Sequence, residues 1–232
     1  MTERVYTAEQ LSGLPGHGVE ALKIRALYSA YGGQYEFCRF FRQGGTYLAC
    51  LDGSFVICEG GRTDWEELAG FLTMNGFTDI FCSVSAGREL RGKIPAEFSR
   101  VDLMEFGSAG TGGALPDCSP SEAWKVISAR FPIEFEPWYL DMSHRVRHGI
   151  SRCISDGRAA LVVQHSINGE SLISQVSVLP EYERQGIAGS LLRSTCSALG
   201  GTIQVICGDE LTGFYEKCGF RHAGFRYCAA RV

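Results

Sequence analysis

The sequence predicts a mixed α/β fold of the α+β type, in which a sheet is flanked by helices. Short apolar and β-branched runs alternate with segments of helical periodicity in both halves of the chain. Turn pairs such as Asp52-Gly53 and Asn168-Gly169 separate consecutive strand candidates. The 232 residues are 45% hydrophobic and 21% charged, which is enough to form a core without metals or disulfides.

A flexible segment divides the chain nearly in half. Residues 107–118 are rich in Gly, Ala and Ser and contain Pro116, a composition typical of a linker. We therefore predict an N-terminal α/β lobe over residues 1–106, a linker over residues 107–118 and a second domain over residues 119–232.

Each element of the first half has a local reason in the sequence. Apolar residues at helical spacing run up to Gly32-Gly33, which predicts a helix that ends there. Asp52-Gly53 predicts a hairpin, and the spacing of Thr63 and Glu66 predicts a capping box at the start of a second helix. The first predicted helix covers residues 20–31, and the second carries Trp65, Leu68, Ala69 and Leu72. The predicted strands cover residues 46–51, 54–58, 79–84 and 101–106.

The second half alternates strands and helices in the same manner. A long helix is predicted from Gly186 to the pair Gly200-Gly201, and Pro180 is predicted to end the strand before it. The predicted helices cover residues 121–131, 186–199 and 211–218, and the predicted strands cover residues 150–154, 159–165, 171–179, 202–207 and 225–232.

Composition narrows the class of partner and the compartment. A net charge of −4 and a pI near 5.8 argue against a nucleic-acid-binding surface. No apolar run has the length of a membrane span, no signal peptide is recognisable, and ten scattered cysteines indicate free thiols in a reducing cytoplasm. His144 and His148 lack the third ligand of a zinc site, so no metal is expected.

A strand-to-helix turn near residue 186 is a candidate phosphate site. The first N–H groups of a helix have no internal partner and lie at the positive end of its dipole. Gly186, Ala188 and Gly189 would let an anion approach these groups closely, as a diphosphate does at other helix starts. Small residues that only pack a helix on a strand would give the same pattern, and neither the GxGxxG nor the Walker fingerprint is present.

Two segments of the second half resemble the GNAT superfamily of N-acetyltransferases. Residues 183–189 are similar to the family's acetyl-CoA-binding motif Gln/Arg-x-x-Gly-x-Gly/Ala, with Glu183 at its first position. Residues 211–220 are similar to its second motif, Phe-Tyr-Glu-Lys-x-Gly-Phe. The resemblance covers about residues 121–232. It implies a GNAT-like acyl-CoA N-acyltransferase fold with a mixed, mostly antiparallel twisted sheet.

The resemblance also implies an activity and a site. The implied reaction moves an acetyl group from acetyl-CoA, the co-substrate, to a primary amine of a small molecule or peptide by direct attack in a ternary complex. Tyr215 is implied to protonate the departing thiolate, although its helical spacing alone would make it a core residue. The strand after Gln175 is implied to splay from its neighbour. The implied cofactor-binding residues are Val176, Ser177, Val178, Glu183, Arg184, Gln185, Gly186, Ile187, Ala188, Gly189, Ser190 and Lys217.

Several questions stay open from the sequence. The general base is not identified, and the carboxylates and imidazole considered for the acceptor side are Glu136, Asp141, His144 and Glu170. A non-catalytic acyl-CoA-binding or sensor module would share the motifs, as would a nucleotide-binding protein that uses Asp209 for a ribose.

One segment of the first half is similar in sequence to a segment of the second half. Residues 68–77 align without a gap on residues 211–220, with Leu72 in place of Tyr215. This alignment suggests a degenerate GNAT-like lobe that has lost the acid, and therefore two tandem lobes. An amphipathic helix that ends at a glycine would give the same match.

Overall fold

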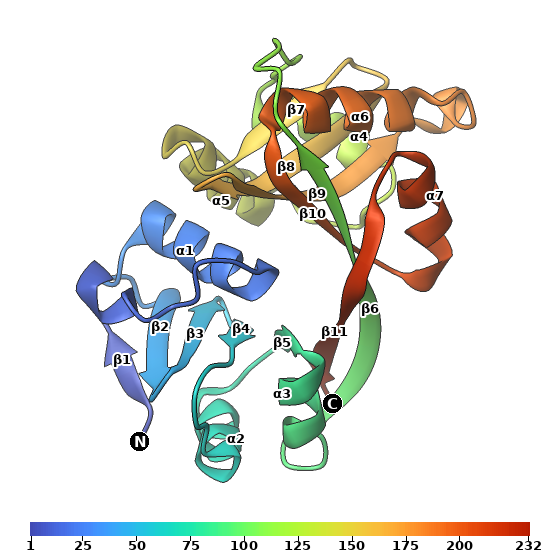
Figure 1. The fold of residues 1–232 in the computed structure, drawn as a ribbon. Helices are drawn as coiled ribbons and strands as arrows, with labels where there is room; N and C mark the ends of the chain where they lie inside the picture. Colours follow the sequence, from blue (N-terminus) through green and yellow to red (C-terminus); the bar gives the residue numbers. More distant parts are fainter. The chain divides into compact units, whose positions relative to one another are not determined.

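The computed structural model describes residues 1–232 as two compact units (Figure 1). The first unit consists of Met1–Asp102 and Gly224–Val232, and the second of Leu103–Ala223. Strands β6 (Ala96–Ser108) and β11 (Arg221–Arg231) contribute residues to both units. The last nine residues, which the sequence placed with the second domain, thus belong to the first unit.

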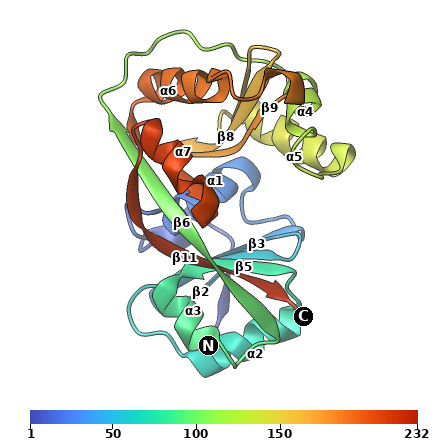
Figure 2. The ribbon, with the colours of Figure 1, turned by 90° about the vertical axis from the view of Figure 1, so that its right-hand side faces the viewer.

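In the first unit, helices cover both faces of a mixed sheet. The strand order is β1-β2-β3-β4-β5-β11-β6. Neighbouring strands from β1 to β4 are antiparallel, whereas β4 and β5 are parallel. Helices α2 and α3 pack on one face and α1 on the other (Figure 2). The bounds are β1 (Glu3–Val5), η1 (Ala8–Leu11), α1 (Val19–Tyr31), β2 (Cys38–Gln43), β3 (Thr46–Leu51), β4 (Ser54–Cys58), α2 (Trp65–Asn75), β5 (Asp79–Ser83) and α3 (Val84–Leu90).

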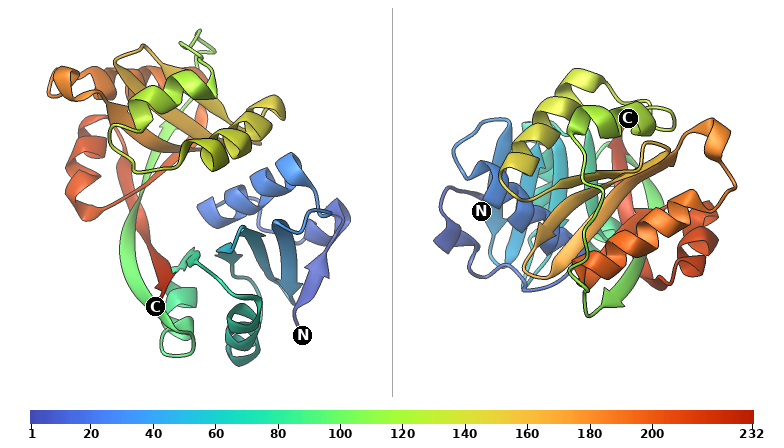
Figure 3. Two further views of the ribbon diagram at one scale, coloured as in Figure 1. Left: turned by 180° about the vertical axis from the view of Figure 1, so that it is seen from behind. Right: turned by 90° about the horizontal axis from the view of Figure 1, so that it is seen from above.

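The second unit has the same layered organisation. Its strand order is β6-β10-β9-β8-β7, in which β7, β8 and β9 are antiparallel and β9 and β10 parallel. Helices α4 and α5 cover one face, and α6 and α7 the other (Figure 3). The bounds are α4 (Pro120–Ile127), α5 (Phe135–Arg147), β7 (Arg152–Ser155), β8 (Ala159–Ile167), β9 (Glu170–Val178), η2 (Pro180–Tyr182), α6 (Ile187–Leu199), β10 (Gly201–Cys207), η3 (Asp209–Leu211) and α7 (Thr212–Lys217).

The predicted fold class is confirmed, and most elements lie where the sequence placed them. The hairpin β3–β4 turns at Asp52-Gly53, where both residues have positive φ, as a two-residue turn of this sequence requires. Strands β1 and β2 and helices α3 and α5 are not among the predicted elements. No helix in the chain has the length and apolar character needed to cross a membrane.

Two predicted helix starts are wrong. Asp64, not Thr63, caps α2, and its carboxylate accepts a hydrogen bond from the Glu67 N–H at 3.1 Å. The Thr63 hydroxyl instead lies 2.6 Å from the Thr46 hydroxyl, so it is engaged away from the helix. Helix α4 starts at Pro120 behind a capping box of Ser119 and Glu122, and it ends at Ile127 rather than at residue 131.

The two units repeat one order of elements. In the first unit the order is β3-β4-α2-β5-α3-β6, and in the second it is β8-β9-α6-β10-α7-β11. By position, α2 therefore corresponds to α6, and α3 corresponds to α7. The alignment of residues 68–77 with residues 211–220 is wrong by one helix. It arose because Gly76 and Gly219 both end a helix at positive φ and are both followed by Phe.

Candidate active site

Strands β9 and β10 separate part-way along their length. Their parallel pairing ends at Ile173 and Val205, although β9 continues to Val178 and β10 to Cys207. A bulge lies at the point of separation, where Gln175 has a φ of 53° and the register against β8 shifts. The implied splay is thus observed. It leaves the backbone of β9 beyond Ile173 without a strand partner on the β10 side.

Contacts from α4 and α5 hold the separated part of β9 in place. The Trp138 indole N–H donates to the Gln175 side-chain oxygen at 3.1 Å, and the Ser177 hydroxyl donates to the Val126 carbonyl at 2.9 Å. Val176 and Val178 alternate to the opposite face, where they pack against the core beneath α6 and α7. The strand is therefore fixed by its side chains while its backbone edge stays open.

The N-terminus of α6 carries uncapped N–H groups. Its N-cap, Gly186, has a left-handed backbone (φ 76°, ψ 4°), which glycine adopts at no steric cost, and no side chain caps the helix. The first bond within the helix runs from the Ser190 N–H to the Gly186 carbonyl at 3.0 Å. The three N–H groups of residues 187–189 precede that bond, so they can receive an anion at the positive end of the helix dipole.

The separated strand, the helix start and α7 line one pocket of about 720 Å³. All the predicted site residues line it except two, Gln185 and Ser190. These two line a neighbouring pocket of about 350 Å³ together with Asp156 and Arg158. The larger pocket is lined by Arg130, Val176, Ser177, Val178, Tyr182, Glu183, Arg184, Gly186, Ile187, Ala188, Gly189, Leu211, Phe214, Tyr215 and Lys217.

Basic side chains outnumber acidic ones around this pocket. Arg130, Arg184 and Lys217 line it, and the only carboxylate among the lining residues is that of Glu183. The Arg130 guanidinium pairs with that carboxylate at 3.1 Å. Arg130 therefore offsets the acidic residue that stands at the first position of the loop motif. Arg130 could not be predicted as a site residue from the sequence, because it follows α4 and no motif contains it.

Tyr215 is buried at the inner end of α7. Its ring packs edge-on against Phe214 and Phe220, with centroids 5.1 and 5.6 Å away. Burial raises the pKa of the phenol, and the nearby Cys207 and Cys218 raise it further. The side chain is thus neutral and protonated over the physiological range, and it is both a core residue and a wall of the pocket.

The acceptor-side residues named from the sequence lie outside the pocket lining. Asp141 pairs with the buried Arg145 at 2.7 Å, and the His144 and His148 rings stack with centroids 4.1 Å apart. Glu170 is buried at the start of β9. No group of three or more His, Cys, Asp or Glu side chains that could hold a metal ion occurs in the chain.

Sequence comparison gives the same assignment for this part of the chain. A family model described as an acetyltransferase (GNAT) domain matches residues 148–222, which include β9, the start of α6 and α7. Residues 148–222 are therefore similar in sequence to a GNAT acetyltransferase domain. No curated protein matches the chain in sequence.

Solved structures extend the GNAT fold over nearly the whole chain. A GCN5-related N-acetyltransferase from Kribbella flavida is 13% identical, with a TM-score of 0.63, over 91% of this chain and 93% of that one. A GNAT-family acetyltransferase from Colwellia psychrerythraea is 12% identical (TM-score 0.55; 99% and 98% covered). A tandem GNAT protein from the clavulanic acid biosynthesis pathway is 11% identical (TM-score 0.53; 99% and 98% covered). At these identities the likeness concerns the fold, and family and fold together support acyl-CoA-dependent acetyl transfer.

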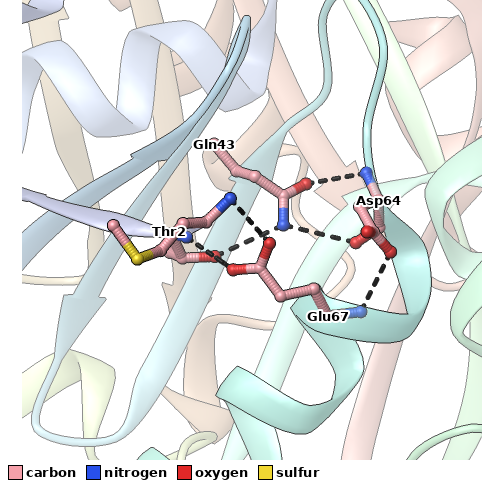
Figure 4. Close-up of polar contacts among 5 residues, drawn as sticks. Thr2, Gln43, Asp64 and Glu67 are labelled. Atoms are coloured by element: carbon pink, nitrogen blue, oxygen red, sulfur yellow. Dashed lines mark hydrogen bonds and ion pairs between the residues drawn. The ribbon is translucent and has the colours of Figure 1, made fainter.

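The first unit lacks the features that open the pocket in the second unit. The last residue of β4 that pairs with β5 is Ile57, and β4 ends one residue later. The first unit therefore has no strand that continues beyond its pairing as β9 does. Side chains of the first unit occupy the N-terminus of α2 (Figure 4). Asp64 accepts from the Glu67 N–H, and Gln43 bonds both the N–H and the carbonyl of Asp64, at 2.8 and 3.3 Å. An anion would meet the Asp64 and Glu67 carboxylates there.

Proposed function

We propose that the second unit is an acetyl-CoA-dependent N-acetyltransferase that transfers the acetyl group to a primary amine by direct attack in a ternary complex. The observation that carries the proposal is the uncapped N-terminus of α6 beside the separated edge of β9. These features suit the two parts of coenzyme A that differ most, a diphosphate and an amide-bearing pantetheine arm.

The start of α6 would hold the diphosphate through the N–H groups of residues 187–189. Gly186 leaves the backbone accessible, and the side chains of Arg130, Arg184 and Lys217 add positive charge at the pocket wall. The residues present therefore fit the group.

The open edge of β9 would bind the pantetheine arm by backbone hydrogen bonds, with Val176 and Val178 beneath it. The bound cofactor supplies an activated acetyl thioester. A backbone N–H fixed near the carbonyl oxygen of such a group contributes about 100-fold to 1000-fold in rate in other acyl transfers. Because Trp138 and Ser177 hold β9 from its other face, its backbone donors are already positioned before the substrates bind.

Tyr215 would donate a proton to the leaving thiolate. An ordinary thiol has a pKa near 8.5. Burial keeps the phenol of Tyr215 protonated well beyond that value, so the proton is available at neutral pH. The hydroxyl is carried by the short helix α7, which is locked to the core by Phe220 and Cys218.

Thiol release from acetyl-CoA, measured with and without a panel of amine classes, tests the proposal. We expect each protein chain to bind one molecule of acetyl-CoA. We expect thiol to be released only when one class of primary amine is present. Binding without turnover on any amine would instead support a sensor module. Preferential binding of ATP or NAD over acetyl-CoA, measured by thermal shift, would support a nucleotide-binding protein.

A further inference from the structure

Gln204 is a buried polar residue in the middle of β10. It is 2% exposed, and it lies one residue before the last pair that joins β10 to β9. Its side-chain N–H donates to the Glu105 carboxylate on β6 at 2.8 Å. An ionised carboxylate can only accept hydrogen bonds, so the NH₂ end of the amide must face Glu105. The amide oxygen of Gln204 consequently points elsewhere.

That amide oxygen is buried and has no hydrogen-bond partner. Buried polar atoms without a partner are rare in folded proteins, and each one calls for a donor or a functional reason. The hydroxyl oxygen of Ser174 on β9 is a second such atom. Leu172 lies opposite Gln204, and Ser174 is two residues further along β9, so both β9 residues share the face of Gln204.

This face of the sheet is opposite to the coenzyme pocket. The neighbours of Gln204, Ile203 and Val205, pack into the core beneath α6 together with Tyr215. Since side chains alternate along a strand, Gln204 faces away from α6. Pairing between β9 and β10 stops immediately after Val205, so a group bound at Gln204 lies next to the gap between the strands.

We propose that Glu105 and Gln204 bind the acceptor amine in its protonated form, a primary ammonium group, which gives up a proton to solvent before its neutral nitrogen attacks. This inference rests on the proposed function and names the acceptor side of the same site. An ammonium group carries three N–H donors and one positive charge. The Gln204 oxygen and the Glu105 carboxylate provide the acceptors and the opposite charge, whereas an acidic or purely apolar acceptor satisfies neither. Glu105 is only half-buried, so part of this residue is exposed to solvent.

NMR of the side-chain amide groups tests the assignment with two matched probes. Butylammonium has the N–H donors, and butyltrimethylammonium has the same chain and charge without them. We expect butylammonium to shift the Gln204 side-chain resonance in the full-length protein and butyltrimethylammonium to shift it much less. The Glu105→Gln variant replaces the charged carboxylate by a neutral amide of the same size, and it should weaken butylammonium binding by about tenfold or more, because hydrogen bonds between charged groups are the stronger ones.

Two further measurements separate the possible outcomes. The Gln204→Leu variant should bind butylammonium more weakly, and its unfolding temperature should change little, because it removes a buried acceptor that has no donor but also the hydrogen bond to Glu105. Acetyl-CoA affinity should be unchanged in both variants. If the wild-type protein itself did not bind acetyl-CoA, that result would count against the proposed coenzyme site and not against the ammonium site. Equal shifts with both probes, or no response at Gln204, would overturn the inference.

Discussion

Substituting the N-cap of α6 separates the charge of the diphosphate site from its shape. Gly186 stands at the position that Asp64 occupies in α2, and Asp64 caps that helix with its carboxylate. A Cβ at residue 186 would meet no atom within 4 Å, so only the left-handed backbone opposes a side chain there. Asp and Asn tolerate this conformation about equally, which makes Gly186→Asn a control for Gly186→Asp.

The two variants should differ mainly by one negative charge beside the diphosphate. For charges about 5 Å apart, an effective dielectric constant of about 20 gives a repulsion of about 3 kcal/mol. Gly186→Asp should therefore bind coenzyme A about a hundredfold more weakly than Gly186→Asn in calorimetric titrations at low salt. The difference should shrink as salt is added. Equal affinities for the two variants would refute an anion site at this helix start.

Three other predictions follow from contacts around the pocket and from the packing of the second unit. Tyr215→Phe should lower the turnover number about 100-fold or more with little change in acetyl-CoA affinity. Because burial raises the pKa of the Tyr215 phenol, the phenol should stay protonated between pH 7 and 9, and wild-type activity should not fall in that range through its ionisation. A fall in activity over that range that is absent in the variant would contradict the acid role. Arg130→Ala should weaken coenzyme A binding more when Glu183 is present than in the Glu183→Gln background, because the arginine offsets that carboxylate, and additive effects in a double-mutant cycle would contradict this coupling. Gly201→Ala should lower the free energy of unfolding by more than 1 kcal/mol in denaturant titrations, because the φ of Gly201 is 74° and a Cβ would clash with the Gly169 carbonyl oxygen. Unchanged stability would contradict this prediction and show that the turn rearranges to make room for the methyl group.

The parts of the fold that depend on a few adjacent residues, such as tight turns and helix ends, could be predicted from the sequence. The Asp52-Gly53 hairpin and the helix start at Gly186 lie where they were predicted, because turn conformation and helix termination are decided within a few positions. The cap of α2 was misplaced by one residue because Thr46, from a neighbouring strand, engages Thr63. That competition is invisible without the tertiary structure.

Contacts between distant parts of the chain could not be predicted in this way. Glu105 and Gln204 are 99 positions apart, and only the pairing of β6 beside β10 brings them together. Arg130 likewise reaches Glu183 through the packing of the second unit. The proposed coenzyme side of the site could be inferred from the sequence because its motif is contiguous, whereas the proposed acceptor side is assembled from separate strands.

Backbone amide shifts at the start of α6 test the central claim most directly. Coenzyme A and pantetheine share the arm that would lie along β9, but only coenzyme A has the diphosphate. On adding coenzyme A, the amide resonances of residues 187–189 should move strongly downfield, and pantetheine should leave them nearly unchanged while it shifts residues 176–178. Saturable binding of coenzyme A that leaves the amides of residues 187–189 unmoved would contradict the account.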